Sequence, residues 1–212
     1  MPPNAFDAVL CDVDGVVRHW DRDAMNQIDR THGLPPGTLA ATAFAPVRLE
    51  PAVTGRVTDA EWRATIVADL VSTSGAAPHE AQAMVDAWSA LTGAVDLDVM
   101  ALLTEVRRHV PVVLVSNATT RLEDDLSRLG IIDAVDAVVN TSRIGVAKPD
   151  ARVYRHAAAR AGADPTRCLF VDDAAGHVDG ARAAGMTGVH FAGVDNLRTA
   201  LSPLLCEATG QR

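Results

Sequence analysis

The regular alternation of short apolar runs with helix-like segments constrains the fold of this chain most strongly. Apolar, β-branched runs typical of buried strands occupy residues 8–13, 110–115, 137–140, 168–171 and 188–191. Amphipathic, helix-like segments lie between them at residues 100–108, 120–129, 151–161 and 174–184. Apolar strands that alternate with helices are typical of parallel sheets covered on both faces. The sequence therefore predicts an α/β fold, a doubly wound parallel sheet with a Rossmann-like core.

Residues 17–95 interrupt this alternation and contain only helix-like segments. These segments lie at residues 22–31, 36–44, 58–72 and 78–90. Thr58 and Glu61 form the pattern of a capping box at the start of the third segment. An insert directly after the first strand is expected to lie over the carboxyl end of that strand, where a lid belongs. We therefore predict a core of residues 1–16 and 96–212 with an inserted α-helical cap domain of residues 17–95.

Composition and charge exclude several classes of partner. The 212 residues carry a net charge of −8 and no basic stripe, so a nucleic-acid partner is not expected. No apolar run reaches the ~20 residues needed to span a bilayer, and the amino terminus lacks the pattern of a signal peptide. Cys11, Cys168 and Cys206 have neither disulfide nor zinc-site spacing. We expect a cytoplasmic monomer or homodimer that acts on a small molecule, without nucleic-acid or membrane partners.

Two carboxylates, Asp12 and Asp14, stand at the end of the first predicted strand, where the apolar run of residues 8–11 stops in the sequence Asp-Val-Asp-Gly-Val. Open α/β sheets bind their ligands at the carboxyl ends of the strands, so both side chains lie where a ligand is expected. Aspartate and glycine are also ordinary turn residues, which leaves a purely structural role open. A calcium-binding loop is disfavoured, because its sixth position requires glycine and is Val17 here.

Further polar residues follow later apolar segments of the predicted core. They are Ser116 and Asn117 after the second strand, Lys148 after the strand-like segment 142–146, and Asp172 and Asp173 after residues 168–171. Each has an ordinary alternative: the first two as turn formers, the lysine as a solvated cation, and the aspartates as helix caps. Their common place at one edge of a parallel sheet favours a shared site.

The charges of such a shared site require compensation. Four carboxylates, those of Asp12, Asp14, Asp172 and Asp173, would face the single positive charge of Lys148. Two unit charges ~4 Å apart repel by roughly 4 kcal/mol at an effective dielectric constant of 20, so the cluster requires protonation or a divalent cation. Oxygen ligands without cysteine or histidine favour Mg²⁺, which binds carboxylates together with a phosphate oxygen. An ionised aspartate can attack phosphorus without a general base.

These motifs, in this order, resemble those of the haloacid dehalogenase-like hydrolase superfamily. The resemblance rests on Asp12-Val-Asp14-Gly-Val, Ser116-Asn117, Lys148-Pro149-Asp150 and Phe170-Val-Asp172-Asp173, and it covers almost the whole chain. The closing stretch, residues 170–186, is similar to that of small sugar-phosphate phosphatases and of the phosphatase-like domain of soluble epoxide hydrolases. The helical insert is similar to the cap of this superfamily.

The resemblance implies a phosphatase, a Mg²⁺-dependent phosphoric monoester hydrolase that acts through an aspartyl-phosphate on a small phosphorylated metabolite. It makes Asp12 the nucleophile and Asp14 the general acid and base. Ser116 and Lys148 bind the transferred phosphoryl group. Asn117 is also a substrate-binding residue, and it helps to shape the loop that carries Ser116. The presence of Asp14 disfavours a true dehalogenase, since those members lack an acid at this position.

The resemblance also implies a metal site. Mg²⁺ is bound by the Asp12 carboxylate, the backbone carbonyl of Asp14 and Asp173, while Asp172 acts behind these ligands. His177 stands where related phosphatases usually carry asparagine, and it is either a hydrogen-bond partner of the acidic loop or a surface histidine.

Three alternative functions stay open at this point. Phosphomutases of the superfamily usually continue the first motif with Thr-Asp, where this chain has Val17-Arg18. A dehalogenase of the same superfamily is the second alternative. A phosphorylation-controlled signalling module is the third, although receiver domains carry the acidic pair before the acceptor aspartate. Substrate choice is expected in residues of the first loop and the helical insert, with candidates Arg18, His19, Trp20, Arg48, Arg56 and Trp62.

Overall fold

A five-stranded parallel sheet forms the centre of the computed structural model, which describes residues 5–205. Its strands are β1 (Ala8–Cys11), β4 (Val112–Ser116), β5 (Ala137–Asn140), β6 (Cys168–Asp172) and β7 (Thr187–His190). They are ordered β5-β4-β1-β6-β7, and every neighbouring pair is parallel. The predicted doubly wound sheet is therefore confirmed. Since β1 lies between β4 and β6, the loops that follow these three strands share one edge.

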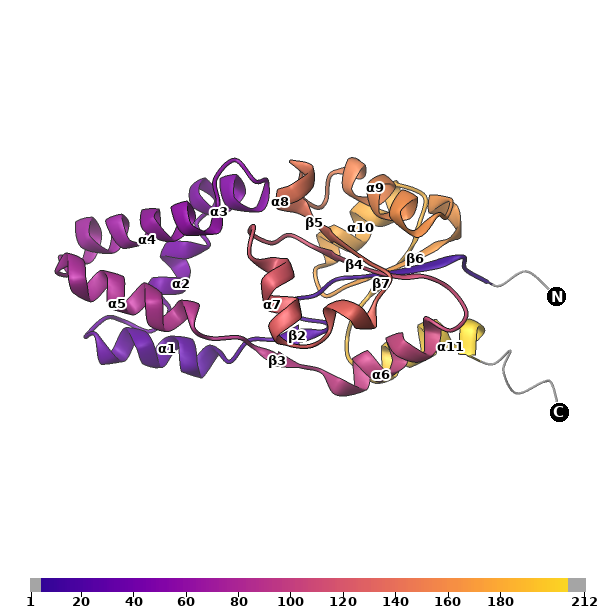
Figure 1. Cartoon of the computed structure of the whole chain (residues 1–212), viewed down its shortest axis with the longest axis horizontal. Helices are drawn as coiled ribbons and strands as arrows, with labels where there is room; N and C mark the ends of the chain where they lie inside the picture. The colour runs from indigo at the N-terminus through magenta and orange to yellow at the C-terminus, as the bar shows by residue number, and fades with distance from the viewer. Residues whose placement is uncertain (1–4, 206–212) are drawn as a thin grey trace.

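Helices cover both faces of this sheet (Figure 1). α9 (Ala151–Ala161) and α10 (Ala175–Ala183) pack on one face, and α6 (Leu97–Val106) and α11 (Val194–Leu205) pack on the other. Successive side chains of a strand point to opposite faces, so Val9 and Cys11 of β1 enter one apolar core while Ala8 and Leu10 enter the other. This burial on both faces explains the uninterrupted apolar runs of the sequence.

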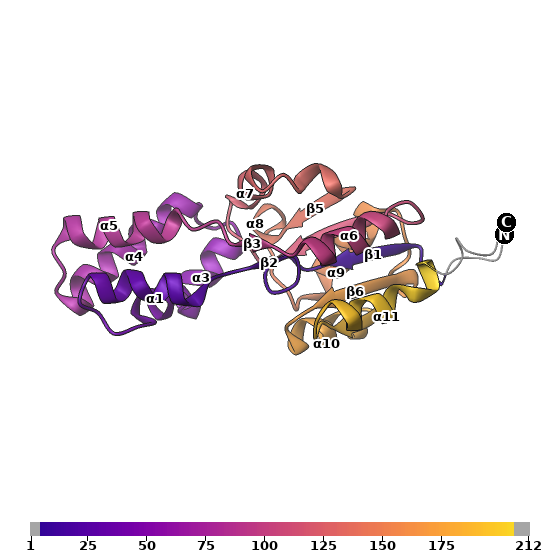
Figure 2. The same ribbon diagram turned by 90° about the horizontal axis from the view of Figure 1, so that it is seen from below.

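The remaining helices form a separate group beyond the carboxyl ends of the strands, as Figures 1 and 2 show from two directions. They are α1 (Arg22–Thr31), α2 (Thr38–Ala43), α3 (Pro46–Val53), α4 (Asp59–Ser74) and α5 (Pro78–Ser89). These helices enclose an apolar core of their own, and the predicted capping box of Thr58 and Glu61 is present at the start of α4. The exact division into a core and a cap domain of residues 17–95 stays a prediction.

The chain passes between the sheet and this helical group twice, and the two crossings pair with each other. β2 (Arg18–His19) and β3 (Ala94–Val95) form a two-stranded antiparallel ribbon. Two-residue strands carry no periodic pattern, so the sequence did not predict them. The ribbon ties the polar loop after β1 to the helical group.

One predicted strand was wrong. Residues 142–146 are not a strand, because the chain turns into the short helix α8 (Thr141–Ile144) directly after β5. The Asn140 side chain caps this turn by accepting a hydrogen bond from the Ser142 amide at 3.1 Å. Lys148 therefore reaches the sheet edge from the loop before α9 and not from the end of a strand.

Short 3-10 turns at Ile132–Ala134 and Pro165–Arg167 and the helix α7 (Leu122–Arg128) complete the described fold. Cys11 and Cys168 are buried, and Cys206 lies outside the described residues. Among the helices of residues 5–205, none combines the length and the apolar character that a membrane span requires.

Candidate active site

The polar loop after β1 forms the centre of the site. Asp12 is buried, and its amide donates a hydrogen bond to the Val171 carbonyl of the neighbouring strand at 2.9 Å. The chain then turns at Gly15, whose φ of +91° favours glycine. A Cβ atom at Gly15 would lie 2.1 Å from Oδ2 of Asp173, so glycine also permits the close approach of the loop after β6. The turn at Gly15 thus allows the loop after β1, which carries Asp12, to lie against the loop after β6, which carries Asp173.

Lys148 lies between the carboxylates of two neighbouring strands. Its Nζ donates hydrogen bonds to Asp12 Oδ1 at 2.8 Å, to Asp172 Oδ2 at 2.7 Å and to the Val115 carbonyl at 3.0 Å. The lysine is buried, and it is the sole lysine of the 212 residues. Burial of a charged side chain is costly unless the charge is paired and hydrogen-bonded, and these three contacts meet that requirement for Lys148.

Asn117 fixes the loop that carries this lysine. Its Nδ2 donates to the Lys148 carbonyl at 3.0 Å, and its Oδ1 accepts from the Lys148 amide at 2.8 Å. This reciprocal pair joins the loop after β4 to the loop before α9. Ser116 ends β4 and is buried, and its hydroxyl has no hydrogen-bond partner among residues 5–205. The hydroxyl is therefore available to a ligand at this edge.

Burial and ionic contacts set the protonation of the three buried groups. Burial raises the pKa of Asp12 to about 6, although the charge of Lys148 works in the opposite direction. Burial alone would lower the pKa of Lys148, but the charges and hydrogen bonds of the two aspartates outweigh it and the pKa is raised. Burial alone would raise the pKa of Asp172, but the hydrogen bond from His177, the charge and hydrogen bond of Lys148 and the Ala174 amide outweigh it, so the pKa is lowered. The group is a buried lysinium between two carboxylates, of which Asp12 is protonated more readily.

The acidic residues of the two central loops form a cluster that suits a cation. One carboxylate oxygen from each of Asp12, Asp172 and Asp173 lies within 4.8 Å of the others. Asp172 is committed within the protein, because Oδ2 accepts from Lys148 and Oδ1 accepts from the Ala174 amide at 2.8 Å. His177 Nδ1 lies 3.1 Å from both oxygens of Asp172, so His177 is a partner of the acidic loop. Asp173 is exposed at the same edge.

The Asp14 side chain points toward the crossing into the helical group. Arg18 of β2 donates from Nε to Asp14 Oδ1 at 2.7 Å and from Nη2 to Oδ2 at 3.0 Å. Trp20 Nε1 donates to the same Oδ1 at 2.7 Å, and the Arg18 guanidinium lies 4.7 Å from the centre of the Trp20 ring. Arg18 and Trp20 were predicted from the sequence as substrate contacts, and here they hold a predicted catalytic carboxylate.

A cavity of 610 Å³ lies between the sheet edge and the helical group. Asp14, Asn117 and Asp173 line it on the side of the sheet. Of the predicted specificity residues, Arg18, His19, Trp20 and Trp62 line it as well. Arg48 and Arg56 do not line it, and they pair instead with Asp69 and, at 2.7 Å, with Glu50.

Sequence reasoning missed several lining residues: Phe44, Arg63, Trp88 and Arg121. Aromatic residues make up only 4% of the chain, and all three tryptophans line the cavity. The scarcity of tryptophan could therefore have pointed to Trp88 as a candidate lining residue.

The chain belongs to the haloacid dehalogenase-like hydrolases, because the model of that family matches residues 6–185. A protein of Mycobacterium tuberculosis named as a phosphatase is 52% identical over 54 residues, which cover 26% of this chain and 25% of the relative. The mouse haloacid dehalogenase-like hydrolase domain-containing protein 3 is 34% identical over 115 residues, 54% of this chain and 44% of the relative. The matches thus span less than half of these two relatives. Validoxylamine A 7′-phosphate phosphatase of Streptomyces hygroscopicus is 26% identical over 190 residues, 85% of this chain and 83% of the relative.

Solved structures share the fold at low identity. A HAD family enzyme of Bacteroides thetaiotaomicron, in complex with magnesium and inorganic phosphate, has a TM-score of 0.67 at 19% identity. The superposition covers 86% of this chain and 92% of that enzyme. L-2-haloacid dehalogenase of Xanthobacter autotrophicus has a TM-score of 0.63 at 21% identity, covering 93% of this chain and 82% of the dehalogenase. At these identities the likeness shows the fold alone, and one of the proteins that share the fold is a dehalogenase.

Proposed function

We propose that this hydrolase cleaves phosphate monoesters of small metabolites through an aspartyl-phosphate on Asp12, with Mg²⁺ as cofactor. The observation that carries the proposal is the contact of Lys148 with both Asp12 and Asp172 at the shared edge of β1, β4 and β6. A buried cation beside a buried carboxylate suits a reaction in which an anionic nucleophile meets an anionic phosphate. The free hydroxyl of Ser116 lies at the end of the neighbouring strand β4.

The proposed reaction has two steps, with Asp14 as the proton carrier in both. In the first, a carboxylate oxygen of Asp12 bonds to phosphorus while the bond from phosphorus to the leaving oxygen breaks, and Asp14 gives that oxygen a proton. In the second, Asp14 takes a proton from water as the water oxygen attacks phosphorus, which releases phosphate and restores the Asp12 carboxylate. Proton transfer of this kind is typically worth ~10²–10⁴ in rate. Lys148 and Ser116 hold the phosphoryl oxygens.

The donor set fits a hard divalent cation, because it consists of carboxylate oxygens. We assign Asp12, Asp173 and the backbone carbonyl of Asp14 as its ligands. Asp172 is left out, since its two oxygens already accept from Lys148, the Ala174 amide and the His177 side chain. When bound, Mg²⁺ offsets the negative charge of the phosphate and its acceptor. Asp172 then acts on the metal site only through Lys148 and the loop that it shares with Asp173.

Two further observations favour a phosphatase over the alternatives. The names of two relatives, in Mycobacterium tuberculosis and Streptomyces hygroscopicus, describe phosphatases. A dehalogenase shares the fold, but true dehalogenases of the superfamily lack an acid at the position of Asp14. In this chain the Asp14 carboxylate is present and lines the cavity.

We further propose that residues 17–95 act as a cap, because their helices form the wall of this cavity opposite the sheet edge.

The direct test is hydrolysis of an aryl phosphate by the wild type and by Asp12→Asn, each with Mg²⁺ and with EDTA. The proposal predicts release of phosphate by the wild type with Mg²⁺ alone and loss of turnover in the variant. Asp179→Asn is a matched control, since Asp179 is an exposed residue of α10. Full turnover by Asp12→Asn would remove Asp12 as the nucleophile, and equal turnover in EDTA would remove the metal.

A further inference from the structure

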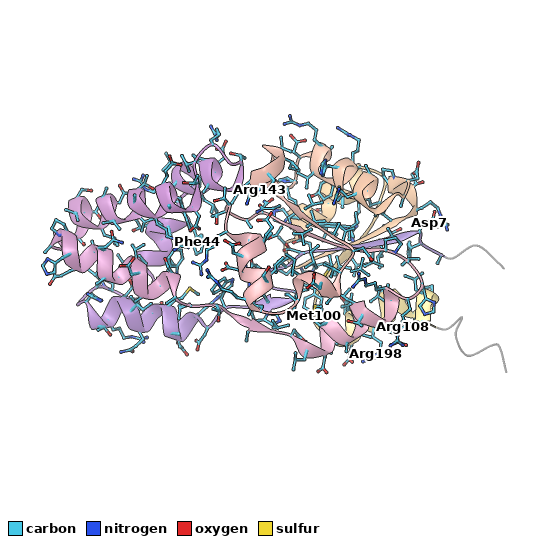
Figure 3. The ribbon with its side chains drawn as sticks, viewed as in Figure 1. Asp7, Phe44, Met100, Arg108, Arg143 and Arg198 are labelled. Carbon is cyan, nitrogen blue, oxygen red and sulfur yellow. The ribbon has the colours of Figure 1, made fainter. Side chains whose placement is uncertain are left out.

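Three aromatic rings form the wall of the cavity opposite the acidic loops. They are Phe44 at the end of α2, Trp62 of α4 and Trp88 of α5, and their ring centres lie 5.6–6.5 Å apart. Trp62 is buried and its indole N–H donates to the Ala43 carbonyl at 3.2 Å, so it serves as the base of this wall. Phe44 is 49% exposed, although large apolar side chains are usually buried. Figure 3 places Phe44 on the side of the helical group that faces the sheet.

We propose that this wall binds a flat, uncharged heteroaromatic ring in the leaving group of the substrate, as in a nucleoside monophosphate. The inference rests on the proposed function, because it places the phosphate at Asp12 and the rest of the substrate in the cavity. The same cavity is lined by Asp14 and Asp173 at one end and by the three rings at the other. Its volume of 610 Å³ lies within the usual range for small-molecule sites, about 300–1,000 Å³.

The charges around the cavity argue against a second anionic group in the substrate. Four arginines and four aspartates line it, so their formal charges cancel: Arg18, Arg22, Arg63 and Arg121 against Asp14, Asp59, Asp125 and Asp173. Three of the arginines are already paired, as Arg18–Asp14 at 2.7 Å, Arg63–Asp59 at 2.5 Å and Arg121–Asp125 at 2.7 Å. A carboxylate or second phosphate on the leaving group would compete with these aspartates. A neutral ring avoids that competition.

Two buried polar atoms on the lining explain why the ring should carry heteroatoms. The Ser89 hydroxyl, one residue after Trp88, is buried without a hydrogen-bond partner among the described residues. Nη1 of Arg18 is also buried without one, and it lies 3.7 Å from Oδ2 of Asp125, beyond hydrogen-bond distance. Buried donors without partners are costly, so each is expected to meet an acceptor when the site is filled. Carbonyl oxygens and ring nitrogens of a nucleobase are such acceptors, and a plain hydrocarbon ring has none.

Two substrates that differ only in the ring test the proposal. Uridine 5′-monophosphate and ribose 5-phosphate share the sugar and the phosphate ester, and kcat/KM is measured for both with Mg²⁺. Stacking of a base on an aromatic side chain is worth about 1–3 kcal/mol, so kcat/KM for the nucleotide should be higher by about fivefold to about 150-fold. Phe44→Ala should bring the ratio of the two values toward one. Val47→Ala is the matched control, since Val47 is an exposed apolar residue of α3 outside the cavity lining, and it should keep the ratio.

Tryptophan fluorescence separates binding of the ring from turnover. Trp20, Trp62 and Trp88 are the three tryptophans of the chain and all line the cavity. In Asp12→Asn, uridine 5′-monophosphate should therefore change the emission saturably, after correction for nucleotide absorbance, and Phe44→Ala should weaken this response.

The outcomes distinguish the two proposals. Equal kcat/KM for the two substrates in the wild type would overturn the ring site and leave the phosphatase standing. A saturable fluorescence response that needs Phe44, without hydrolysis of any monoester by the wild type, would support the ring site and overturn the phosphatase. The absence of both a fluorescence response to uridine 5′-monophosphate and a preference for it over ribose 5-phosphate would overturn the ring site.

Discussion

Replacing Lys148 by methionine removes the cation between two buried carboxylates while keeping most of the side-chain volume. In the wild type, Nζ lies 2.8 Å from Asp12 Oδ1 and 2.7 Å from Asp172 Oδ2. Coulomb's law at an effective dielectric constant of 20 gives roughly 6 kcal/mol for each contact, and desolvation of the charges offsets much of this. Removal of one partner from a buried ion pair costs about 3–5 kcal/mol. We therefore expect Lys148→Met to lower the free energy of unfolding by about that amount at neutral pH.

The assay is equilibrium unfolding in urea, followed by tryptophan emission, in a buffer that contains EDTA. The double variant Asp12→Asn with Lys148→Met is the control, because it removes one of the two carboxylates left without a cation. Its loss should be smaller than that of Lys148→Met alone. An equal or larger loss in the double variant would mean that packing of the lysine stem, and not its charge, stabilises the site.

The pH dependence of this loss follows from Asp12. Because the pKa of Asp12 is raised to about 6 in the folded protein, protonation favours folding, and the stability that this group contributes falls as pH rises from about 4 to 6. Without Lys148 the pKa of Asp12 rises further, so the difference between wild type and variant should be larger near pH 7.5 than near pH 5. A difference that is the same at both pH values, or larger near pH 5, would refute the ionic account.

Two further substitutions test the geometry of the acidic loops. Gly15→Ala would bring a Cβ atom within 2.1 Å of Oδ2 of Asp173, so we expect weaker activation by Mg²⁺ together with a loss of about 1–2 kcal/mol of stability from the positive φ. Gly130→Ala, also at positive φ but in open space, should lose stability alone, and an identical Mg²⁺ titration of both variants would contradict this reasoning. Arg18→Gln removes both guanidinium bonds to Asp14 and should lower kcat on an aryl phosphate about tenfold or more with little change in KM; an unchanged kcat would exclude Arg18 as a positioning residue for Asp14.

The sheet was predictable because burial on both faces leaves a signal that is local in the sequence. Strand β5 and helices α1 and α9 have the predicted bounds, and the apolar runs of the other strands end within a few residues of the observed ones. The positions of Asp12, Ser116 and Asp172 followed from the same signal, since each stands where an apolar run stops. Their convergence at one edge is a property of parallel strands, which the alternation with helices had already indicated.

Other features depend on contacts that leave no local pattern. The helices α3 and α11 were not predicted from the sequence. α3 contains Pro51, which lowers its helix propensity, and α11 follows the last predicted strand without a distinctive motif. Lys148 reaches the sheet edge from a loop, and its pairing with Asn117 is a contact across 31 positions of the chain. Nothing in the spacing of Asp14, Arg18 and Trp20 indicated that the last two bind the first, because a turn at Gly15 sets their relation.

The contact of Arg18 and Trp20 with Asp14 gives the helical group a physical connection to the proposed chemistry. Arg18 lies in the β2–β3 ribbon, through which the chain enters and leaves the helices α1 to α5. Any displacement of these helices that moves the ribbon also moves the donors that orient the Asp14 carboxylate. Asp14, the proposed acid and base, is thus held by Arg18 and Trp20, which belong to the same insert, residues 17–95, as the three aromatic rings of the cavity wall.

The most direct test of the account is to trap the phosphoryl group on the enzyme. The wild type is mixed with excess aryl phosphate and Mg²⁺, quenched in acid during turnover and digested, and the peptides are analysed by mass spectrometry. We expect one added phosphoryl group on the peptide that contains Asp12, and none on the same peptide of Asp12→Asn. Turnover without any label on Asp12, or with the label on another residue, would contradict it.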